Sequence, residues 1–562
     1  MKTLPKTLLD VAKRNSVLAL SVLVTVALVL MLAVDFTIWK LLFLIASTGL
    51  MAVCIFDIRQ TRSTLARNFP GLAHGRDFLL FMRPYLRQYI VEGDKEGRPF
   101  DYEARDLIYK RANGDSDTHP FGTERKLDRE ETSWMAHSII PAVNVNTNPR
   151  ITIGEGEQAY SASVLNISAM SLGSLSEKAV ESMNLGARKG GFFQDTGEGG
   201  LSEWHLKHGG DVVFEIGTGY FGCRDENGDF DPKLFAKKAR HPAVKMTELK
   251  LSQGAKPGYG GAVPAAKMTQ NVARTRQMPA HEKCQSPATH SAFATPVELL
   301  KFIDRMRTLS GGKPVGIKLC VGLPHEIFAL IKAMRSHDIY PDYIVVDGAE
   351  GGTGGAPVEF SDWVGMPLEQ GLAFMRNALV GAGLRERIKL GASGRVYSGA
   401  GMMRCLAIGA DWCNAARAFM LSIGCVQAQR CHTNKCPTGV TSMDPHRQKG
   451  IVVEEQAERV RRFHSETVKS LTDLVAAAGL SHPSELRPFH LAKGFRETGF
   501  THFPSGELIL DENILLNDPE STPYSSYWQA ASPDSFSPVS AKGYTQAIST
   551  RKRTTDYFQT SV

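Results

Sequence analysis

The sequence predicts an α/β protein in which a (β/α)₈ TIM barrel follows an N-terminal two-helix transmembrane hairpin. Three observations predict this organisation. Two long apolar runs lie within the first 60 residues, short apolar runs alternate with helical patterns between residues 160 and 420, and glycine-rich segments follow several of the short runs. Strands that alternate with helices of about ten to fifteen residues indicate parallel βαβ units. About eight such units close a barrel, and a doubly wound open sheet is the alternative.

The first apolar run covers residues 16–34, and the second covers residues 41–56 with an extension over residues 36–39. At a rise of about 1.5 Å per residue, each run is nearly long enough to cross a hydrocarbon core of about 30 Å. Basic residues precede the first run and follow the second. The positive-inside rule therefore places both ends of a hairpin formed by residues 1–60 in the cytoplasm. The alternative, a cleaved signal peptide, would have a shorter apolar region without a second run behind it.

Composition excludes several other classes of protein. Hydrophobic residues make up 43% and charged residues 22% of the 562 residues, which excludes global disorder. The net charge of +7 is spread along the chain without a long basic block, so we expect no nucleic-acid partner. Nine cysteines in a chain of this length do not indicate a secreted disulfide scaffold.

The expected barrel strands are short apolar runs at residues 164–170, 212–216, 315–320, 343–346 and 388–391. Between several of them lie helical patterns, at residues 176–188, 295–308, 325–336, 368–379 and 400–408. Glycine-rich segments are expected at the ends of strands, and these segments cover residues 168–173, 196–200, 253–258, 347–355 and 393–395. Because the active sites of barrels lie at the carboxyl ends of the strands, we expect these segments to line one site.

A phosphorylated cofactor such as FMN suits these segments. Glycine exposes backbone N–H groups to which a phosphate can bind. Ser393, Gly394 and Arg395 follow the expected seventh strand, and Gly409 and Ala410 lie beside the expected eighth. Barrels commonly hold a phosphate in that region.

Cys425, Cys431 and Cys436 lie within twelve residues, and a proline follows the last of them. Three thiolates can ligate an iron–sulfur cluster, and ferredoxin motifs also end in Cys-Pro. Zinc would usually take a fourth ligand in paired cysteine spacing, and a purely structural role for these cysteines is the other alternative.

Five motifs carry a resemblance to a known family: Ile167–Ser171, Thr196–Gly200, Gln253–Gly258, Asp347–Gly355 and Cys425–Val440. Residues 166–447 resemble the FMN-binding synthase domain of glutamate synthase, and the whole chain resembles stand-alone bacterial FMN-binding glutamate synthase family proteins. The resemblance implies a barrel with FMN and a 3Fe-4S cluster. It also implies an oxidoreductase acting on CH–NH₂ donors, which converts 2-oxoglutarate and ammonia to L-glutamate. The expected location is the bacterial inner membrane, with the catalytic body in the cytoplasm.

The resemblance also implies roles for individual residues. Residues that would line the flavin are Met170, Ser171, Lys318, Gly351, Gly352 and Thr353, and those that would hold its phosphate are Ser393, Gly394, Arg395 and Ala410. A fixed cation at Lys318, near the pyrimidine edge of the ring, would stabilise the anionic reduced flavin. Lys256 and Arg276 correspond to basic residues that bind 2-oxoglutarate, and Glu198 to an acidic residue associated with ammonia delivery. Cys425, Cys431 and Cys436 correspond to the three cluster ligands.

This sequence departs from the family pattern near the expected substrate. Tyr259 and Ala262 replace a glutamate and a glutamine, and Glu215 stands where a glutamine often contacts the flavin. One alternative is therefore an enzyme with the same cofactors that acts on a different amino or keto acid. Another is a membrane-tethered electron-transfer subunit.

No amidotransferase or pyridine-nucleotide region is recognised in the sequence. We therefore expect ammonia to come free or from a separate amidotransferase subunit. Electrons are expected from a donor protein such as ferredoxin or from a membrane redox partner.

The remaining segments are assigned by composition. Residues 61–160 are expected to form a mixed region that packs on the barrel, and residues 161–450 the barrel with its iron–sulfur loop. Residues 451–517 are expected to form a helical extension that begins with an amphipathic helix at 453–479. Residues 518–562, rich in Ser, Pro and Thr, are expected to form a flexible tail.

Overall fold

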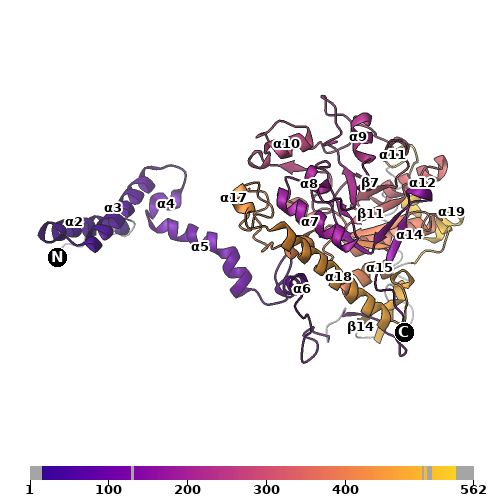
Figure 1. Ribbon diagram of the computed structural model, residues 1–562, viewed down its shortest axis with the longest axis horizontal. Helices are drawn as coiled ribbons and strands as arrows, with labels where there is room; N and C mark the ends of the chain where they lie inside the picture. Colours follow the sequence, from indigo (N-terminus) through magenta and orange to yellow (C-terminus); the bar gives the residue numbers. More distant parts are fainter. Residues whose placement is uncertain (1–14, 128–131, 496–498, 503–508, 540–562) are drawn as a thin grey trace. The chain divides into compact units, whose positions relative to one another are not determined.

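The computed structural model describes residues 15–127, 132–495, 499–502 and 509–539. Contacts between residues divide the chain into two units, Met1–Glu103 and Ala104–Val562. Both are drawn in Figure 1, and each is described by itself.

The first unit contains two long apolar helices. They are α2 (Ser16–Val34) and α3 (Ile38–Arg59), and the Thr25 and Ser47 hydroxyls hydrogen-bond between them at 2.8 Å. Within the described residues, these are the two helices long and apolar enough to cross a membrane. The unit continues with α4 (Thr64–Asn68), α5 (Leu72–Leu86) and a π-helical turn, η1 (Arg87–Val91). The boundaries of α2 agree with the predicted run, and α3 contains the second run together with the last two residues of its four-residue extension.

The second unit is built on a closed barrel of parallel strands, which confirms the predicted fold class. The strands are β4 (Leu165–Ile167), β5 (Gln194–Asp195), β6 (Val212–Ile216), β7 (Val244–Lys250), β10 (Val315–Leu319), β11 (Tyr343–Asp347), β12 (Lys389–Ser393) and β13 (Trp412–Ala415). Pairing follows chain order, β13 pairs with β4 to close the ring, and every neighbouring pair is parallel.

Helices after the strands surround the barrel (Figure 1). They are α7 (Glu177–Gly190), α8 (Glu203–Leu206), α9 (Pro232–Ala239), α10 (Gln270–Arg276), α11 (Pro296–Ser310), α12 (Pro324–His337), α13 (Val358–Trp363), α14 (Leu368–Gly381), α15 (Gly399–Ile408), α16 (Arg417–Ser422), α17 (Pro445–Gln448) and α18 (Val453–Ala477). Their ends follow local chemistry: α11 begins with a reciprocal Thr295–Glu298 cap and ends where Gly311 adopts a left-handed conformation.

Helix α18 is the predicted amphipathic helix, and its apolar side packs on the barrel unit. His464 is buried and stacks on Phe192 with ring centroids 3.9 Å apart. Val460 lies so close to Gly186 of α7 that a Cβ at this glycine would be 2.5 Å away. Small side chains therefore let α7 and α18 approach closely.

Shorter elements complete the unit. The helices are α6 (Tyr102–Asn113), which begins at the boundary between the units, α19 (Ile514–Asn517) and α20 (Ser525–Ala530). The strands are β1 (Ser133–Met135), β2 (Arg150–Ile153), β3 (Tyr160–Ser163), β8 (Ala262–Val263), β9 (Cys284–Gln285), β14 (Leu491–Phe495) and β15 (Gly499–His502). The 3₁₀ turns are η2 (Gly156–Gln158), η3 (Ala265–Lys267), η4 (Pro483–Glu485), η5 (Pro488–His490) and η6 (Pro519–Ser521). The expected 61–160 region is thus divided, because residues 61–103 belong to the unit of the apolar helices.

The structure differs from the expected flexible tail over residues 518–539. Trp528 of α20 packs edge-on against Phe328 of α12, with ring centroids 5.6 Å apart. Lys332 of α12 donates hydrogen bonds to the carbonyl groups of Trp528 at 2.6 Å and Ala531 at 2.9 Å. The aromatic residues anchor a segment whose overall composition suggested disorder. Residues 540–562 of that expected tail lie outside the described residues.

Candidate active site at the carboxyl end of the barrel

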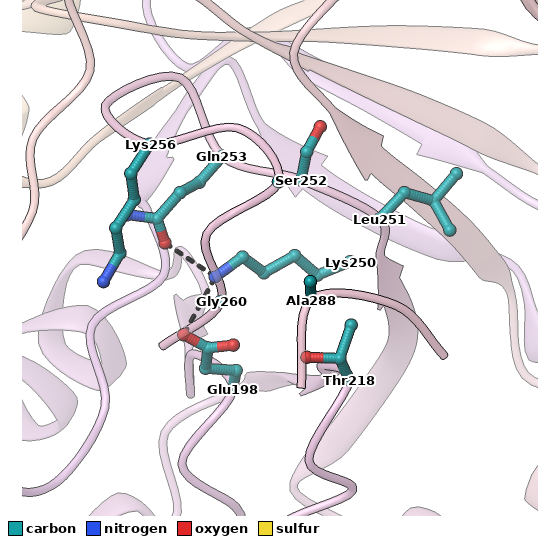
Figure 2. A pocket seen from close by; sticks show the side chains of 10 residues that line it. Glu198, Thr218, Lys250, Leu251, Ser252, Gln253, Lys256, Gly260 and Ala288 are labelled. Carbon is teal, nitrogen blue, oxygen red and sulfur yellow. Dashed lines mark hydrogen bonds and ion pairs between the residues drawn. The ribbon is translucent and has the colours of Figure 1, made fainter. Parts of the chain in front are cut away.

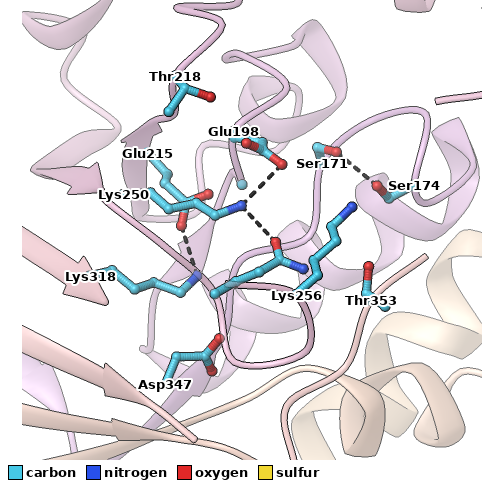
Figure 3. Close-up of polar contacts among 12 residues, drawn as sticks. Ser171, Ser174, Glu198, Glu215, Thr218, Lys250, Lys256, Lys318, Asp347 and Thr353 are labelled. Atoms are coloured by element: carbon cyan, nitrogen blue, oxygen red, sulfur yellow. Dashed lines mark hydrogen bonds and ion pairs between the residues drawn. The ribbon is translucent and has the colours of Figure 1, made fainter. Parts of the chain in front are cut away.

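Residues from several strand ends gather at one end of the barrel. Figure 3 shows Ser171 from the segment after β4, Glu198 from the segment after β5, and Lys256 from the segment after β7. Thr353, from the segment after β11, lies near Lys256 in the same view. Carboxyl ends of parallel strands meet at one mouth of a barrel, so residues far apart in the chain come together there.

A small pocket of about 20 Å³ lies among these residues (Figure 2). It is lined by Glu198, Thr218, Lys250, Leu251, Ser252, Gln253, Lys256, Gly258, Gly260 and Ala288. The pocket thus contains two of the three predicted catalytic residues, one acidic and one basic.

Glu198 is the acidic group of this pocket. Its carboxylate pairs with Lys250 at 3.0 Å, and Lys250 also donates to the Gln253 side chain at 2.6 Å. Burial disfavours the carboxylate, but Lys250, Lys256 and Arg276 hold the pKa of Glu198 below its usual value. Glu198 is therefore ionised at neutral pH and surrounded by cations.

Lys256 and Arg276, the predicted substrate-binding pair, are both buried. The Lys256 ammonium donates to the Gly355 carbonyl at 3.2 Å, and burial lowers the pKa of Lys256. Arg276 donates to the Ser171 hydroxyl at 3.0 Å and lies over the Phe221 ring at 4.9 Å. Among the residues that the structure describes, the Arg276 Nε group has no hydrogen-bond partner, so a buried donor remains available.

Lys250 is a site residue that sequence reasoning missed. Glu248 and Lys250 are two residues apart on β7, so both side chains point to the same side of the strand. Alternation along β7, combined with the position of Lys250 just before the Gln253–Gly258 motif, was the signal that could have identified it.

Lys318 lies inside the barrel, as predicted for a strand residue, but it is paired. Its ammonium contacts the Glu215 carboxylate at 2.8 Å, and both side chains are buried. Burial disfavours the charge on Lys318, yet Glu215 and the neighbouring acids raise its pKa above the usual value. The predicted cation is therefore already compensated by an acidic neighbour.

Two further buried carboxyl groups, those of Asp195 and Glu248, lie beside this pair. Ligand oxygens of Asp195, Glu215 and Glu248 all lie within 4.8 Å of one another, a spacing that could hold a metal ion. Burial, reinforced by Glu215, raises the pKa of Asp195 to about 7, and burial next to Asp195 also raises the pKa of Glu248. Lys318 balances one carboxylate, and the raised pKa values of Asp195 and Glu248 favour the protonated forms of these two groups.

The predicted phosphate-binding residues are separated by the structure. Ser393 ends β12, and its hydroxyl lies 3.2 Å from that of Ser168, which follows β4. Ala410 instead precedes β13, and the adjacent Gly409 carbonyl accepts a hydrogen bond at 2.9 Å from Arg385, which precedes β12. A residue before a strand lies at its amino end, so the placement of Ala410 at the mouth was wrong.

Arg417 occupies the position that Ala410 was expected to fill. It follows β13 directly, lies close enough to Arg395 for the two charges to interact, and donates a hydrogen bond to the Glu350 carbonyl. Burial and the Arg395 charge lower the pKa of Arg417 to about 10. A Cβ on Gly352 would lie 2.7 Å from the Arg417 guanidinium, so only glycine leaves room there.

Thr353 lies in the same loop as Gly351 and Gly352, after β11. Its hydroxyl donates to the Gly355 carbonyl at 3.2 Å, the same carbonyl that accepts from Lys256. The loop that was predicted to line the flavin therefore also contacts the predicted substrate-binding lysine.

The three candidate ligand cysteines lie in the loop between α16 and α17, and all are free thiols. Burial raises the pKa of Cys425 to about 12, whereas hydrogen bonding, including that with the Thr438 hydroxyl 3.5 Å from the Cys436 sulfur, outweighs burial and lowers the pKa of Cys436. The charges of Cys431 and Cys436 also raise the pKa of Cys425.

Lys267, which sequence reasoning also missed, connects the cysteine loop to the mouth. Its buried ammonium donates to the carbonyl groups of Cys431 and Ser174, both at 3.1 Å. Burial lowers the pKa of Lys267 to about 8. A signal for this role is absent from the sequence, because Lys267 lies in a short 3₁₀ turn outside every strand-end motif.

Comparisons with known proteins identify the family. A family model described as the conserved region in glutamate synthase matches residues 118–481. A glutamate synthase large subunit-like protein of Bacillus subtilis is 35% identical over 482 residues, which cover 78% of this chain and 91% of that protein. The archaeal glutamate synthase (NADPH) of Methanocaldococcus jannaschii is 31% identical over 322 residues, which cover 57% of this chain and 60% of that protein.

Solved structures with a similar arrangement include a mandelate oxidase variant with a monooxide FMN adduct, at 14% identity and a TM-score of 0.39, covering 75% of this chain and 99% of that one. A flavocytochrome b2 variant with benzoylformate has 11% identity and a TM-score of 0.41, covering 74% of this chain and 83% of that one.

The family model spans well over half of the chain, and the Bacillus subtilis relative is matched over most of its length. The chain therefore belongs to the glutamate synthase family of oxidoreductases.

Proposed function

We propose that this chain is a membrane-anchored, glutamate synthase-like oxidoreductase that uses FMN and a 3Fe-4S cluster to aminate 2-oxoglutarate with ammonia. The observation that carries the proposal is that Glu198 and Lys256 line one pocket at the barrel mouth, with Arg276 close enough for its charge to act on Glu198. One acid among several cations suits a dicarboxylate together with an ammonium ion.

The residues at the mouth fit FMN. Ser393 and Gly394, with the arginines Arg395 and Arg417, provide hydroxyl, backbone and cationic groups for a phosphate. Met170 and Ser171 lie in the segment after β4, the strand next to β13, and Lys318 lies inside the barrel. Gly352, where a Cβ would meet Arg417, keeps that region open. When bound, FMN supplies hydride transfer.

The cysteine loop fits an iron–sulfur cluster. Cys425, Cys431 and Cys436 are free thiols whose charges interact, and the Thr438 hydroxyl, 3.5 Å from the Cys436 sulfur, supports the thiolate form of Cys436. When bound, the cluster supplies single electrons. Lys267 links this loop to Ser174 at the barrel mouth, which favours a fixed distance between the two cofactors.

The pocket residues have separate tasks in the proposed reaction. Lys256 and Arg276 bind the two carboxylates of the substrate and orient its carbonyl carbon. Glu198 holds an ammonium ion and takes one proton from it, and the resulting ammonia attacks the carbonyl carbon. Loss of water then gives the imine that is reduced to the amino acid. Lys250 contacts the Glu198 carboxylate. It therefore neutralises this carboxylate while the pocket contains no ammonium ion.

A second candidate is reductive amination of a less polar keto acid. Tyr259 packs against Phe360 with ring centroids 5.2 Å apart, and the Lys256 ammonium lies 5.9 Å from the Tyr259 ring centroid. An aromatic wall beside Lys256 favours an apolar side chain over a second carboxylate.

The two apolar helices α2 and α3 support the proposed anchor. Their length and hydropathy suit a membrane hairpin, and the flanking basic residues favour a cytoplasmic body at the bacterial inner membrane. The electrons are proposed to come from a ferredoxin-like or membrane-bound donor, and ammonia to come free or from a separate amidotransferase.

The test is isotopic product analysis with the full-length protein, purified without oxygen and analysed for flavin and iron. With a chemical reductant, ¹⁵N-ammonium and 2-oxoglutarate should give ¹⁵N-labelled glutamate. A panel of keto acids with apolar side chains, assayed in parallel, separates the two candidates. Absence of flavin or iron, or of any labelled amino acid, would contradict the proposal.

A further inference from the structure

The helix that follows the two apolar helices exposes an unusually apolar surface. Phe78 is 61% exposed in α5 and Tyr89 is 62% exposed in η1. With Met82 and Tyr85 they occupy positions i, i+4, i+7 and i+11, so they form one stripe along the helix. We name residues 72–91 the juxtamembrane helix.

The charge around this helix is strongly basic. Residues 59–91 contain six arginines, namely Arg59, Arg62, Arg67, Arg76, Arg83 and Arg87, against one acidic residue, Asp77. The positions of Arg76, Arg83 and Arg87 place them on the side of the helix away from the Phe78 stripe. A groove of about 680 Å³ runs beside them and is lined by Arg76, Arg83 and Arg87, by Leu79, Leu80, Leu86 and Val91, and at one end by Glu92 and Glu96. Glu92 pairs with Arg87, which leaves Arg76 and Arg83 as the arginines of the groove that face no glutamate.

Contacts fix the start of the juxtamembrane helix to the end of α3. Asp57, buried near the end of α3, accepts a hydrogen bond from the Gly71 backbone at 2.9 Å and contacts the His74 ring at 3.0 Å. If α3 crosses a membrane, the juxtamembrane helix therefore starts at the membrane boundary (Figure 1 draws α4 and α5 directly after α3).

We propose that the juxtamembrane helix lies in the headgroup layer of an anionic phospholipid bilayer. The Phe78 stripe enters the boundary of the acyl chains, where aromatic side chains are stable, and the arginines bind lipid phosphates. Anionic lipids in the cytoplasmic leaflet complement the excess of arginine. The inference rests on the proposed membrane anchor and names the lipid that the anchor region recognises.

The test uses the full-length protein in lipid nanodiscs that contain about one-third phosphatidylglycerol. A photoreactive benzoylphenylalanine replaces Phe78, and in a second variant it replaces Tyr89. After irradiation, mass analysis should find mainly lipid adducts at both positions. The matched control carries the same probe at Phe121, a fully exposed phenylalanine of the other unit, and should give few lipid adducts.

A charge arm separates anionic lipid from a merely apolar contact. The double substitution Arg76→Glu and Arg83→Glu should reduce the lipid adducts of the Phe78 probe by up to about fivefold for each arginine replaced. Replacement of phosphatidylglycerol by a neutral lipid should also reduce the adducts. Arg125→Glu, an exposed position in the other unit, is the control and should change nothing.

Adducts to a second copy of the chain, or to the barrel, would overturn the inference while leaving the anchor intact. Release of the wild-type protein from native membranes by alkaline carbonate would instead overturn the anchor, and the inference with it.

Discussion

Charge compensation between individual side chains dominates the candidate site. Around Glu198, the three cations Lys250, Lys256 and Arg276 leave an excess of positive charge at the mouth. Deeper in the barrel the balance is reversed, because Lys318 faces three carboxyl groups. The mouth is therefore suited to an anionic substrate, whereas the surroundings of the interior carboxyl groups favour their protonated forms.

At the mouth, Lys256→Met should weaken substrate binding. A charged hydrogen bond to a carboxylate contributes about 1.5–3 kcal/mol, so the KM for 2-oxoglutarate should rise by roughly 10- to 100-fold with a smaller change in kcat. Steady-state kinetics with Lys435→Met, an exposed lysine of the cysteine loop, provide the matched control. An unchanged KM in Lys256→Met would remove this residue from the substrate site.

In the interior, Glu215→Gln should raise the midpoint potential of the bound flavin. The substitution removes a negative charge 2.8 Å from Lys318 but keeps a side chain of similar size. An uncompensated Lys318 favours the more negative reduced form, and a tenfold preference corresponds to about 30 mV for a two-electron couple. Potentiometric titration of both proteins measures the shift, and a lower potential in the variant would place Lys318 away from the ring.

Asp195 should make stability depend on pH. Its folded pKa of about 7 lies above the value of about 3.9 in an unfolded chain, so its stabilising contribution is complete at low pH and is lost as the pH rises to 7. Asp195→Asn keeps an acceptor for the Gly197 N–H group, which donates to Asp195 at 2.8 Å. The melting temperature of the variant relative to the wild type should therefore increase between pH 5 and pH 8, as measured by calorimetry. A constant difference across that range would show that Asp195 does not titrate there.

Regular elements were predictable where their residues are apolar or follow a clear helical period. The runs at 212–216, 315–320 and 343–346 became β6, β10 and β11, and the helical pattern at 295–308 became α11. Strands β5, β7 and β13 were not anticipated. β5 has two polar residues, β7 carries charged side chains into the barrel, and β13 is only four residues long.

Missing β13 had a consequence for the site. Ala410, beside the expected eighth strand, was predicted to hold the phosphate, although it lies before β13, and Arg417 beyond the strand was overlooked. Glu198, Lys256 and Arg276 were predictable because they belong to, or correspond to, family motifs. Lys250, Lys267 and Arg417 contribute contacts that depend on the tertiary fold.

The η3 turn should set the properties of the cysteine loop through Lys267. Lys267→Met removes two hydrogen bonds and the buried positive charge beside Cys431. A cluster at the cysteines would become harder to reduce, so its midpoint potential should fall, and Lys267→Arg should restore part of the shift. Redox titration followed by electron paramagnetic resonance checks this, with Lys435→Met as the control; equal potentials in all variants would refute it.

At the scale of the whole molecule, hydropathy predicted the apolar helices, and alternation of short strands and helices predicted the barrel. Composition was less reliable: residues 518–539 read as a tail, but Tyr524 and Trp528 dock on the barrel helices. Likewise residues 61–103 group with α2 and α3, because Asp57 and its partners connect them. The position of each of these two segments depends on a few specific contacts, and average composition contains no information about such contacts.

In the proposed reaction, one barrel mouth brings a reduced flavin together with a keto acid and ammonia. Single-turnover oxidation of the anaerobically reduced holoenzyme, followed by flavin absorbance in a stopped-flow instrument, tests this step. We expect rapid reoxidation when 2-oxoglutarate or a related keto acid and ammonium are mixed in together, and little with either alone. Flavin that stays reduced with every keto acid tested in the presence of ammonium would contradict it.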